Sequence, residues 1–181
     1  MKATASALIL AAALLSAACG TGRAIFNVDV HSFLAGTGKD TIPYAIPPLS
    51  SGTVSNTPQQ ISLPPGFGSS IVDSARITGT ADLRNATGAG TVSLQIFLAA
   101  DSQGTFNAPD TIGVAPASVS GTTTTPVIIA GDLTNALNLF NQGEVWIRIA
   151  ATGNNPGATP VTGNMVLTAL LARIVLQEKI L

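Results

Sequence analysis

The alternation of apolar and polar residues with a period of two is the feature that most restricts the fold of this chain. It is strictest at residues 144–151, where Val145, Ile147 and Ile149 alternate with polar or aromatic residues. Successive side chains of a β-strand point to opposite faces of the sheet, so this pattern predicts a strand with one buried face. A chain built from such segments must pair them into sheets whose apolar faces cover one another.

Further stretches with the same pattern, or with a short apolar run, are also predicted to be strands. They are residues 26–34, 59–63, 71–85, 92–99, 112–119, 127–129 and 161–179. The small and polar residues 85–90 predict a tight turn, and hence a hairpin of 71–85 with 92–99. The inward residues expected in the first strand of this hairpin are Ile71, Ala75, Ile77, Ala81 and Leu83.

The last of these strands is apolar on both faces around residues 165–176, which predicts a central position in a sheet. A buried helix is the competing interpretation, because residues 169–173 have good helix propensity. A strand is preferred, since the rest of the chain offers no helical partner. In a variant of this interpretation, the strand completes the sheet of a neighbouring copy, as in donor-strand fibres.

One helix is predicted at residues 133–140, where apolar residues follow helical spacing and Asp132 can cap the first turn. Residues 39–69 are rich in Pro, Gly and Ser, which predicts loops and edge strands rather than a second domain. We therefore expect one all-β domain over residues 25–181. Its predicted architecture is an immunoglobulin-like or related β-sandwich of about seven to nine strands with one short helix.

The amino terminus has the order of a secretory signal peptide. Lys2 supplies the positive charge, residues 8–15 supply an apolar run, and small residues at 16–18 supply a cleavage site. The apolar run is too short to cross a bilayer, which needs about 20 residues. The sequence therefore predicts an exported protein whose signal peptide is residues 1–18.

The only cysteine, Cys19, follows this cleavage site directly, which favours modification of its thiol. Residues 15–20 (LSAACG) resemble the lipobox of bacterial lipoproteins, with Ser16 where that family prefers leucine. The resemblance implies a diacylglyceryl group on Cys19 and a tether at residues 19–24. It also implies attachment to the outer membrane, because glycine rather than aspartate follows the cysteine. Two acyl chains suffice for stable anchoring; secretion without a lipid is the alternative.

Charged residues make up 9% of the chain, against about a quarter in an average globular protein. Beyond the signal peptide, seven basic and nine acidic side chains form no basic patch, which argues against nucleic acid as a partner. Such a neutral surface could be buried against copies of itself or against other envelope proteins. The alternative is a neutral surface that is simply exposed.

The chain contains one histidine, His31, which the predicted first strand places on its polar face together with Asp29. A Ser-His-Asp triad would have to use this pair, but no G-x-S-x-G turn supplies a nucleophile. One histidine and one cysteine also leave too few ligands for a zinc site. The sequence therefore predicts a solvated histidine and a protein that is not an enzyme, with a hydrolase as the minor alternative.

Residues 101–111 are the remaining candidate for chemistry. Asp101, Asn107 and Asp110 follow a strand and offer the carboxylate and amide oxygens that calcium prefers. The spacing differs from that of an EF-hand loop, and two carboxylates make a weak site. A turn held by Asx-type hydrogen bonds is the alternative. Calcium is the one cofactor that the sequence suggests.

Residues 92–101, followed by 106–107 and 110–113, resemble the strand–loop–strand pattern of the CARDB group, the cell-adhesion-related sandwich domains of bacterial surface proteins. The strand beginning at residues 143–146 falls where that fold has its next core strand. The resemblance covers residues 76–151 and implies an immunoglobulin-like fold at the cell surface. It supports the fold more than any activity.

These features favour a lipid-anchored β-sandwich of the cell envelope with a structural or interaction role. It would serve as an adhesion module or as a subunit of a surface layer or filament. The expected partners are the membrane, through lipidated Cys19, and other envelope proteins or further copies of the chain. The alternative is a module that binds a small ligand or glycan, with or without calcium, although few aromatic residues are present to stack on sugars.

Overall fold

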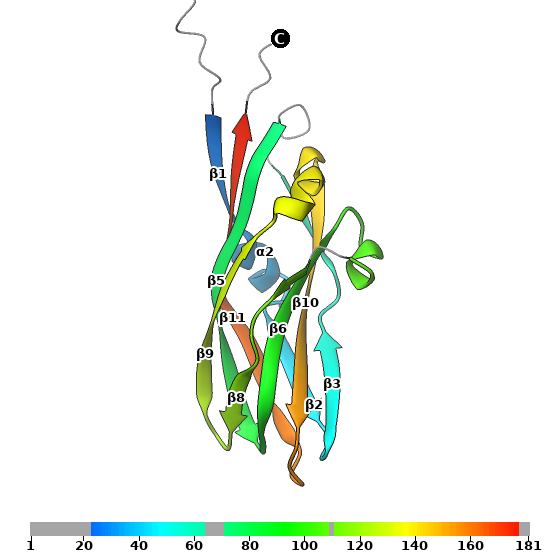
Figure 1. The fold of residues 1–181 in the computed structure, drawn as a ribbon, viewed down its shortest axis with the longest axis vertical. Helices are drawn as coiled ribbons and strands as arrows, with labels where there is room; N and C mark the ends of the chain where they lie inside the picture. The colour runs from blue at the N-terminus through cyan, green and yellow to red at the C-terminus, as the bar shows by residue number, and fades with distance from the viewer. Residues whose placement is uncertain (1–22, 64–70, 109–110, 178–181) are drawn as a thin grey trace, which may run out of the picture.

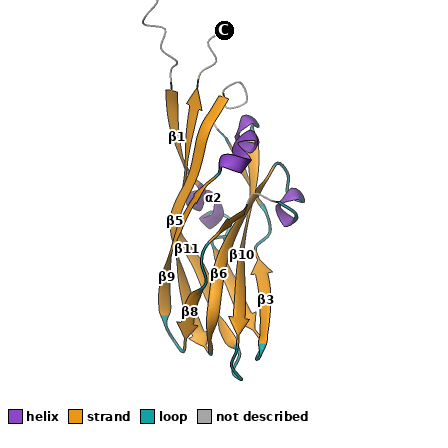
Figure 2. Cartoon of the chain, in the orientation of Figure 1, coloured by secondary structure: helices purple, strands orange, loops and turns teal. Residues whose placement is uncertain are grey.

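The computed structural model describes residues 23–63, 71–108 and 111–177. They form two antiparallel sheets packed face to face, shown with the long axis vertical in Figures 1 and 2. The expected all-β sandwich is confirmed, with eleven strands in the described residues. The count exceeds the prediction because residues 39–63 hold three edge strands and the stretch 112–119 holds two short strands instead of one.

The first sheet has five strands in the order β1-β11-β5-β9, with β2 also pairing with β11. Its strands are β1 (Arg23–Asp29), β2 (Thr41–Ile46), β5 (Ile71–Thr87), β9 (Thr124–Asp132) and β11 (Val161–Gln177). β11 pairs with β5 along one side, and with β1 and then β2 along the other. The predicted central strand is therefore confirmed, and both of its edges are occupied within its own chain.

The second sheet has six strands in the order β3-β10-β6-β7. β4 pairs with β10 and β8 pairs with β6. The strands are β3 (Ser50–Ser55), β4 (Gln59–Ser62), β6 (Ala89–Ala99), β7 (Thr111–Gly113), β8 (Ala117–Ser120) and β10 (Glu144–Asn155). The inward residues predicted for β10 are buried, and they join residues of both sheets in one hydrophobic core.

The predicted hairpin of residues 71–85 with 92–99 is wrong. β5 pairs with β11 and β9, whereas β6 pairs with β10, β7 and β8 in the other sheet. The turn between them passes through Gly88 with a φ of +75°, and a Cβ there would lie 2.4 Å from the carbonyl oxygen of Pro160. The alternation identifies a buried face but not the strand that lies beside it in the sheet.

Four of the five residues predicted to point inward from β5 are buried, but Ile71 is 47% exposed and its neighbour Val72 is buried instead. The pairing of β5 with β11 shifts register between Val175 and Leu176. This irregularity displaces the alternation at the start of β5 by one residue.

The first predicted strand is shorter than expected. β1 ends at Asp29, and helix α2 (Val30–Ala35) follows, so His31 lies on a helix rather than on a strand. The carboxylate of Asp29 accepts hydrogen bonds from the backbone N–H and the hydroxyl of Ser32, which caps the helix. Val30 and Leu34 are buried, and residues four apart share a face in a strand and in a helix alike.

Two short 3-10 helices complete the fold, η2 (Gly104–Phe106) and η3 (Thr134–Asn141). The helix predicted at residues 133–140 is confirmed in position, but its expected cap is wrong. Asp132 ends β9, and Leu133 is the N-cap and makes no side-chain capping bond. Tertiary packing forms this helix instead, since Ala136, Leu139 and Phe140 are buried.

β1 begins and β11 ends at the same end of the long axis, where Arg23 pairs with Gln177 (Figure 1). The opposite end, called the tip below, consists of the loops that join the strands there. These loops are residues 47–49, 88, 121–123 and 156–160.

Candidate functional site

The predicted calcium loop folds over the outer face of the second sheet and encloses Arg148. Although Arg148 points outward from β10, as the alternation predicted, it is only 6% exposed. Its Nε and Nη2 atoms donate hydrogen bonds of 3.1 and 2.8 Å to the carbonyl oxygen of Thr105. Its guanidinium carbon lies 4.0 Å from the ring centre of Phe97 and 4.7 Å from that of Phe106. Arg148 therefore fastens the loop to the sheet.

The loop also holds itself together. Asp101 Oδ1 accepts a 2.7 Å hydrogen bond from the backbone N–H of Gly104, and the hydroxyl of the buried Thr105 donates a 2.7 Å bond to the carbonyl oxygen of Ser102. Asn107 ends η2, and its backbone N–H donates to the carbonyl oxygen of Gly104. The Asp101 bond is the Asx-type contact that the sequence offered as the alternative to a metal site.

Arg148 places a positive charge beside the loop. Burial lowers the pKa of the Arg148 guanidinium from its usual value, but an arginine stays charged at neutral pH. A positive charge beside the loop opposes the binding of a second cation. Asp110, the third predicted calcium ligand, lies outside the described residues. Within those residues, no three His, Cys, Asp or Glu side chains are grouped to hold a metal ion.

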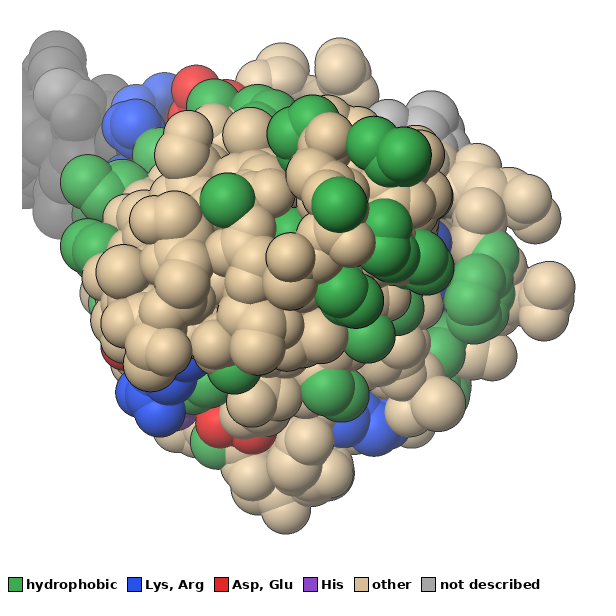
Figure 3. Space-filling view, turned by 90° about the horizontal axis from the view of Figure 1, so that it is seen from below, with side chains coloured by type: hydrophobic (Ala, Val, Ile, Leu, Met, Phe, Trp, Pro, Cys, Tyr) green, Lys and Arg blue, Asp and Glu red, His purple; other side chains and the backbone are tan. Residues whose placement is uncertain are grey.

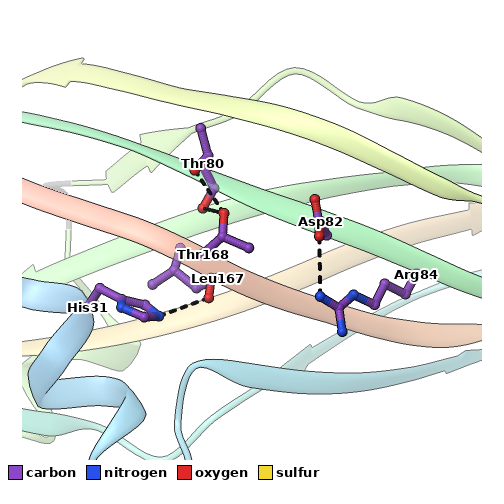
Figure 4. Close-up of polar contacts among 6 residues, drawn as sticks. All are labelled: His31, Thr80, Asp82, Arg84, Leu167 and Thr168. Carbon is purple, nitrogen blue, oxygen red and sulfur yellow. Dashed lines mark hydrogen bonds and ion pairs between the residues drawn. The ribbon is translucent and has the colours of Figure 1, made fainter.

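His31 is half-buried rather than solvated, because α2 carries it against β11 (Figure 4). Its Nε2 atom donates a 3.0 Å hydrogen bond to the carbonyl oxygen of Leu167. The pairing of β11 with β5 shifts register between Leu167 and Ala169. At this bulge, the hydroxyl of Thr168 donates a 3.0 Å bond to the carbonyl oxygen of Thr80. His31 thus provides a hydrogen-bond donor to the backbone carbonyl of Leu167, next to the bulge in the central strand.

Asp29 does not orient His31. The side-chain and backbone hydrogen bonds from Ser32 lower the pKa of the Asp29 carboxyl, and the nearby His31 contributes less to the same shift. The imidazole of His31 donates to the carbonyl oxygen of Leu167, whereas the Asp29 carboxylate accepts from Ser32 and from the backbone N–H of His31. Asp82 and Arg84, also drawn in Figure 4, form an exposed ion pair at 3.3 Å on the outer face of the same sheet.

A side pocket of about 170 Å³ opens between β2 and β3. Its floor consists of five buried residues, Tyr44, Ile46, Val92, Ala151 and Gly153, and its rim of Ala45, Gly52, Thr53 and Val54. The hydroxyl of Tyr44 donates a 3.1 Å hydrogen bond to Asn85 Oδ1, and burial raises the pKa of Tyr44 to about 12. The pocket is mainly apolar, and the residues that line it carry no charge.

The tip also carries a shallow hollow of about 400 Å³. Its lining residues are Gly88, Ala89, Gly121, Gly157, Ala158 and Thr159. None of them is charged or aromatic, so the hollow offers neither an ionic contact nor a ring to stack on a sugar.

Cys19 and the rest of the predicted leader lie outside the described residues. None of the helices in residues 23–63, 71–108 and 111–177 is long and apolar enough to cross a membrane.

No protein-family model matches the chain, and no curated protein matches its sequence. Solved structures resemble it at low similarity. The T13 particle of infectious bursal disease virus (IBDV) shares 12% identity over 88% of this chain and 40% of the viral chain, with a TM-score of 0.43. PirA shares 13% sequence identity over 71% of this chain and 93% of the PirA chain, with a TM-score of 0.28. Dimeric latent PorU from Porphyromonas gingivalis shares 7% sequence identity over 88% of this chain and 13% of the PorU chain, with a TM-score of 0.35.

The chain thus spans about 40% of the length of the viral chain that it resembles. Likeness at this level concerns the β-sandwich alone.

Proposed function

We propose that the chain is a lipid-anchored β-sandwich of the bacterial cell envelope, with a structural or interaction role. The observation that carries the proposal is the short distance along the chain from Cys19 to the sandwich. β1 begins at Arg23, four residues after the cysteine. Four extended residues span at most about 14 Å. A lipid on Cys19 would therefore hold this end of the sandwich close to the membrane.

The tip would then face away from the membrane. The 17 residues of β11 run along the sandwich and span about 56 Å at a rise of about 3.3 Å per residue. Figure 3 looks onto the tip, where charged side chains are few. The tip loops contain no charged residue, and Leu49 among them is 77% exposed. An uncharged end held away from the membrane supports contact with another protein or surface, as in an adhesion module or a layer subunit.

The geometry around His31 gives no support to the hydrolase alternative, because the imidazole is committed to a backbone carbonyl and Asp29 to a helix cap. The Arg148 contacts likewise make the loop at residues 101–108 a structural element of the sandwich.

The proposal is tested on the full chain, expressed in a bacterium that processes lipoproteins. We expect the wild-type protein to partition into detergent and to show the mass of a chain that begins at Cys19 and carries a diacylglyceryl group. Cys19→Ser should remove both properties. Ser16→Leu, which introduces the residue that lipoproteins prefer at this position, is the matched control and should keep them. Unchanged partitioning of Cys19→Ser, or an unmodified Cys19 in the wild type, would contradict the anchor.

A further inference from the structure

We propose that the free edge of β3 pairs with β3 of a second copy of the chain. The two strands would run antiparallel about Thr53, and Val54 of each copy would enter the side pocket of the other. This inference goes beyond the proposed envelope role, and its geometry does not depend on the lipid anchor.

Among the described strands at the edges of the two sheets, β3 is the one without protection. An edge strand exposes unpaired N–H and C=O groups, and proteins usually block such an edge with proline, charge or short length. β2 and β9 contain Pro43 and Pro126, and β1 contains Arg23 and Asp29. β4, β7 and β8 are at most four residues long. β3 has six residues (SSGTVS), without proline or charge.

The backbone of β3 has its free hydrogen-bonding groups at odd-numbered positions. Just beyond the strand, the N–H of Asn56 donates to the carbonyl oxygen of Ile149 on β10. Because strand geometry repeats every two residues, the even-numbered residues of β3 face β10. Ser51, Thr53 and Ser55 therefore turn their N–H and C=O groups to the open side. Residues 51–55 are all exposed.

These free groups fit a second copy in a symmetric register. Antiparallel alignment about Thr53 pairs Thr53 with Thr53 of the other copy, and Ser51 with Ser55 in both directions. Each of these is a hydrogen-bonded pair, so the two strands would form about six main-chain bonds. The side chains on the outer face would be hydroxyl-bearing on both copies, with Thr53 opposite Thr53, and a Thr–Thr contact across strands is favourable.

The same register fills the side pocket. Directly opposite residues share a face of the sheet, so Val54 of one copy would lie opposite Gly52 of the other. A Cβ placed on Gly52 would have no heavy atom within 4 Å, and Val54 is 37% exposed. Gly52 therefore leaves a space on the inner face where an apolar side chain from outside fits. Alignment about Gly52 instead would place Val54 opposite Ser50 and leave the space empty.

The occupant is a second copy because the recess and the protruding side chain lie two residues apart on one strand. A two-fold axis brings each of them to the other, as an isologous contact requires. Neither strand carries a charge that would repel its copy. One pair of six-residue strands buries less than the roughly 800 Å² per partner of a standard interface, so we expect weak pairing that depends on high local concentration. The pairing also points the two amino termini in opposite directions, so it joins chains that are not anchored side by side in one membrane.

Disulfide trapping in the full-length protein, extracted in detergent and concentrated, detects such a contact between chains that are free to lie antiparallel. Thr53→Cys places two cysteines across the axis, where Cα atoms of a hydrogen-bonded pair lie about 5.5 Å apart, within disulfide range. Ser55→Cys is the matched control, since its two copies would be about 13 Å apart along the strands. After mild oxidation, we expect Thr53→Cys to give a dimer band on a non-reducing gel at least about tenfold stronger than that of Ser55→Cys. The wild type, whose one cysteine is Cys19, supplies the background.

A second substitution tests the pocket. Gly52→Val in the Thr53→Cys protein should fill the space that Val54 of the other copy needs and abolish the dimer band. Its melting temperature should not fall, because the added side chain meets open space within its own chain. Gly113→Val on β7, where a Cβ also meets open space, is the matched control and should keep the band. Equal trapping at positions 53 and 55, no trapping at 53, or a band that survives Gly52→Val would each overturn the proposal.

Discussion

Replacement of Arg148 by alanine tests whether this guanidinium fastens the loop at residues 101–108 to the sheet. The substitution removes two hydrogen bonds to the carbonyl oxygen of the fully buried Thr105. A buried acceptor that loses its donors costs about 1–3 kcal/mol. The contacts with the rings of Phe97 and Phe106 contribute about 0.5–1 kcal/mol each. We therefore expect the free energy of unfolding to fall by about 3 kcal/mol.

For a domain of this size, about 3 kcal/mol lowers the melting temperature by about 6–12 °C. Thermal unfolding of the full chain can be followed by the fluorescence of Trp146, the only tryptophan, which lies two residues before Arg148 on the same strand. Arg148→Lys should recover part of the loss, because an ammonium group keeps the charge but not the planar two-donor geometry.

The matched control is Arg76→Ala. Arg76 is exposed and forms a long ion pair of 3.7 Å with Asp132, and such pairs contribute less than about 1 kcal/mol. A melting temperature that falls no further in Arg148→Ala than in Arg76→Ala would refute the assigned role of Arg148.

Three further predictions concern pH and calcium. Burial raises the pKa of Tyr44, the only tyrosine, to about 12, against about 10 in an unfolded chain. The absorbance of the Tyr44 phenolate in the folded protein should therefore titrate near pH 12, and a midpoint near pH 10 would contradict the burial of Tyr44. The contribution of Tyr44 to the free energy of unfolding should be full below about pH 10 and should be lost as the pH rises from about 10 to about 12. The pKa of Asp29 is lowered by Ser32, so its contribution as a helix cap should be present above the unfolded pKa of about 3.9 and lost as pH falls through the lowered value. The melting temperatures of the wild type and Asp29→Ala should differ at pH 7 and converge in acid. Millimolar calcium should leave the melting temperature unchanged, whereas a rise that the double variant Asp101→Ala, Asp110→Ala abolishes would establish the calcium site instead.

The alternation of apolar and polar side chains predicts which residues are buried more reliably than it predicts which strands are neighbours in a sheet. Val145, Ile147 and Ile149 are buried as predicted, because a strand with one apolar face must cover that face in any sandwich. The central place of β11 also follows from the sequence, since a strand that is apolar on both faces needs neighbours around it.

Pairing within the sheets does not follow from the same pattern. β5 and β6 are consecutive, and each has one apolar face, which fits both a hairpin and a crossing between sheets. The structure shows the crossing, with β5 beside β11 and β6 beside β10, and the turn at Gly88 lies against the backbone of Pro160. Pro160 lies in a loop far along the sequence. The contact with Pro160 therefore cannot be predicted from residues 85–90 alone.

The helix after β1 shows a related limit. Val30 and Leu34 suit a strand and a helix equally, because a separation of four residues returns to the same face in both. The side chain of Asp29 favours the helix over the strand, because it accepts a hydrogen bond from the backbone N–H of Ser32 in the first turn. A three-residue spacing from Asp to a free N–H is a signal that the sequence does contain, and it would have moved His31 from a strand to a helix.

The loop at residues 101–108 marks the limit for the candidate site. Carboxylate oxygens at its start suit a calcium ion, and they equally suit a turn in which Asp101 accepts from the backbone of Gly104. Local sequence cannot distinguish the two, because both need the same oxygen atoms in the same tight curve. Arg148 lies 43 residues from Thr105 in the sequence, and only the folded sheet brings its charge under the loop. The chemistry of such a loop is therefore determined by the strand that it covers.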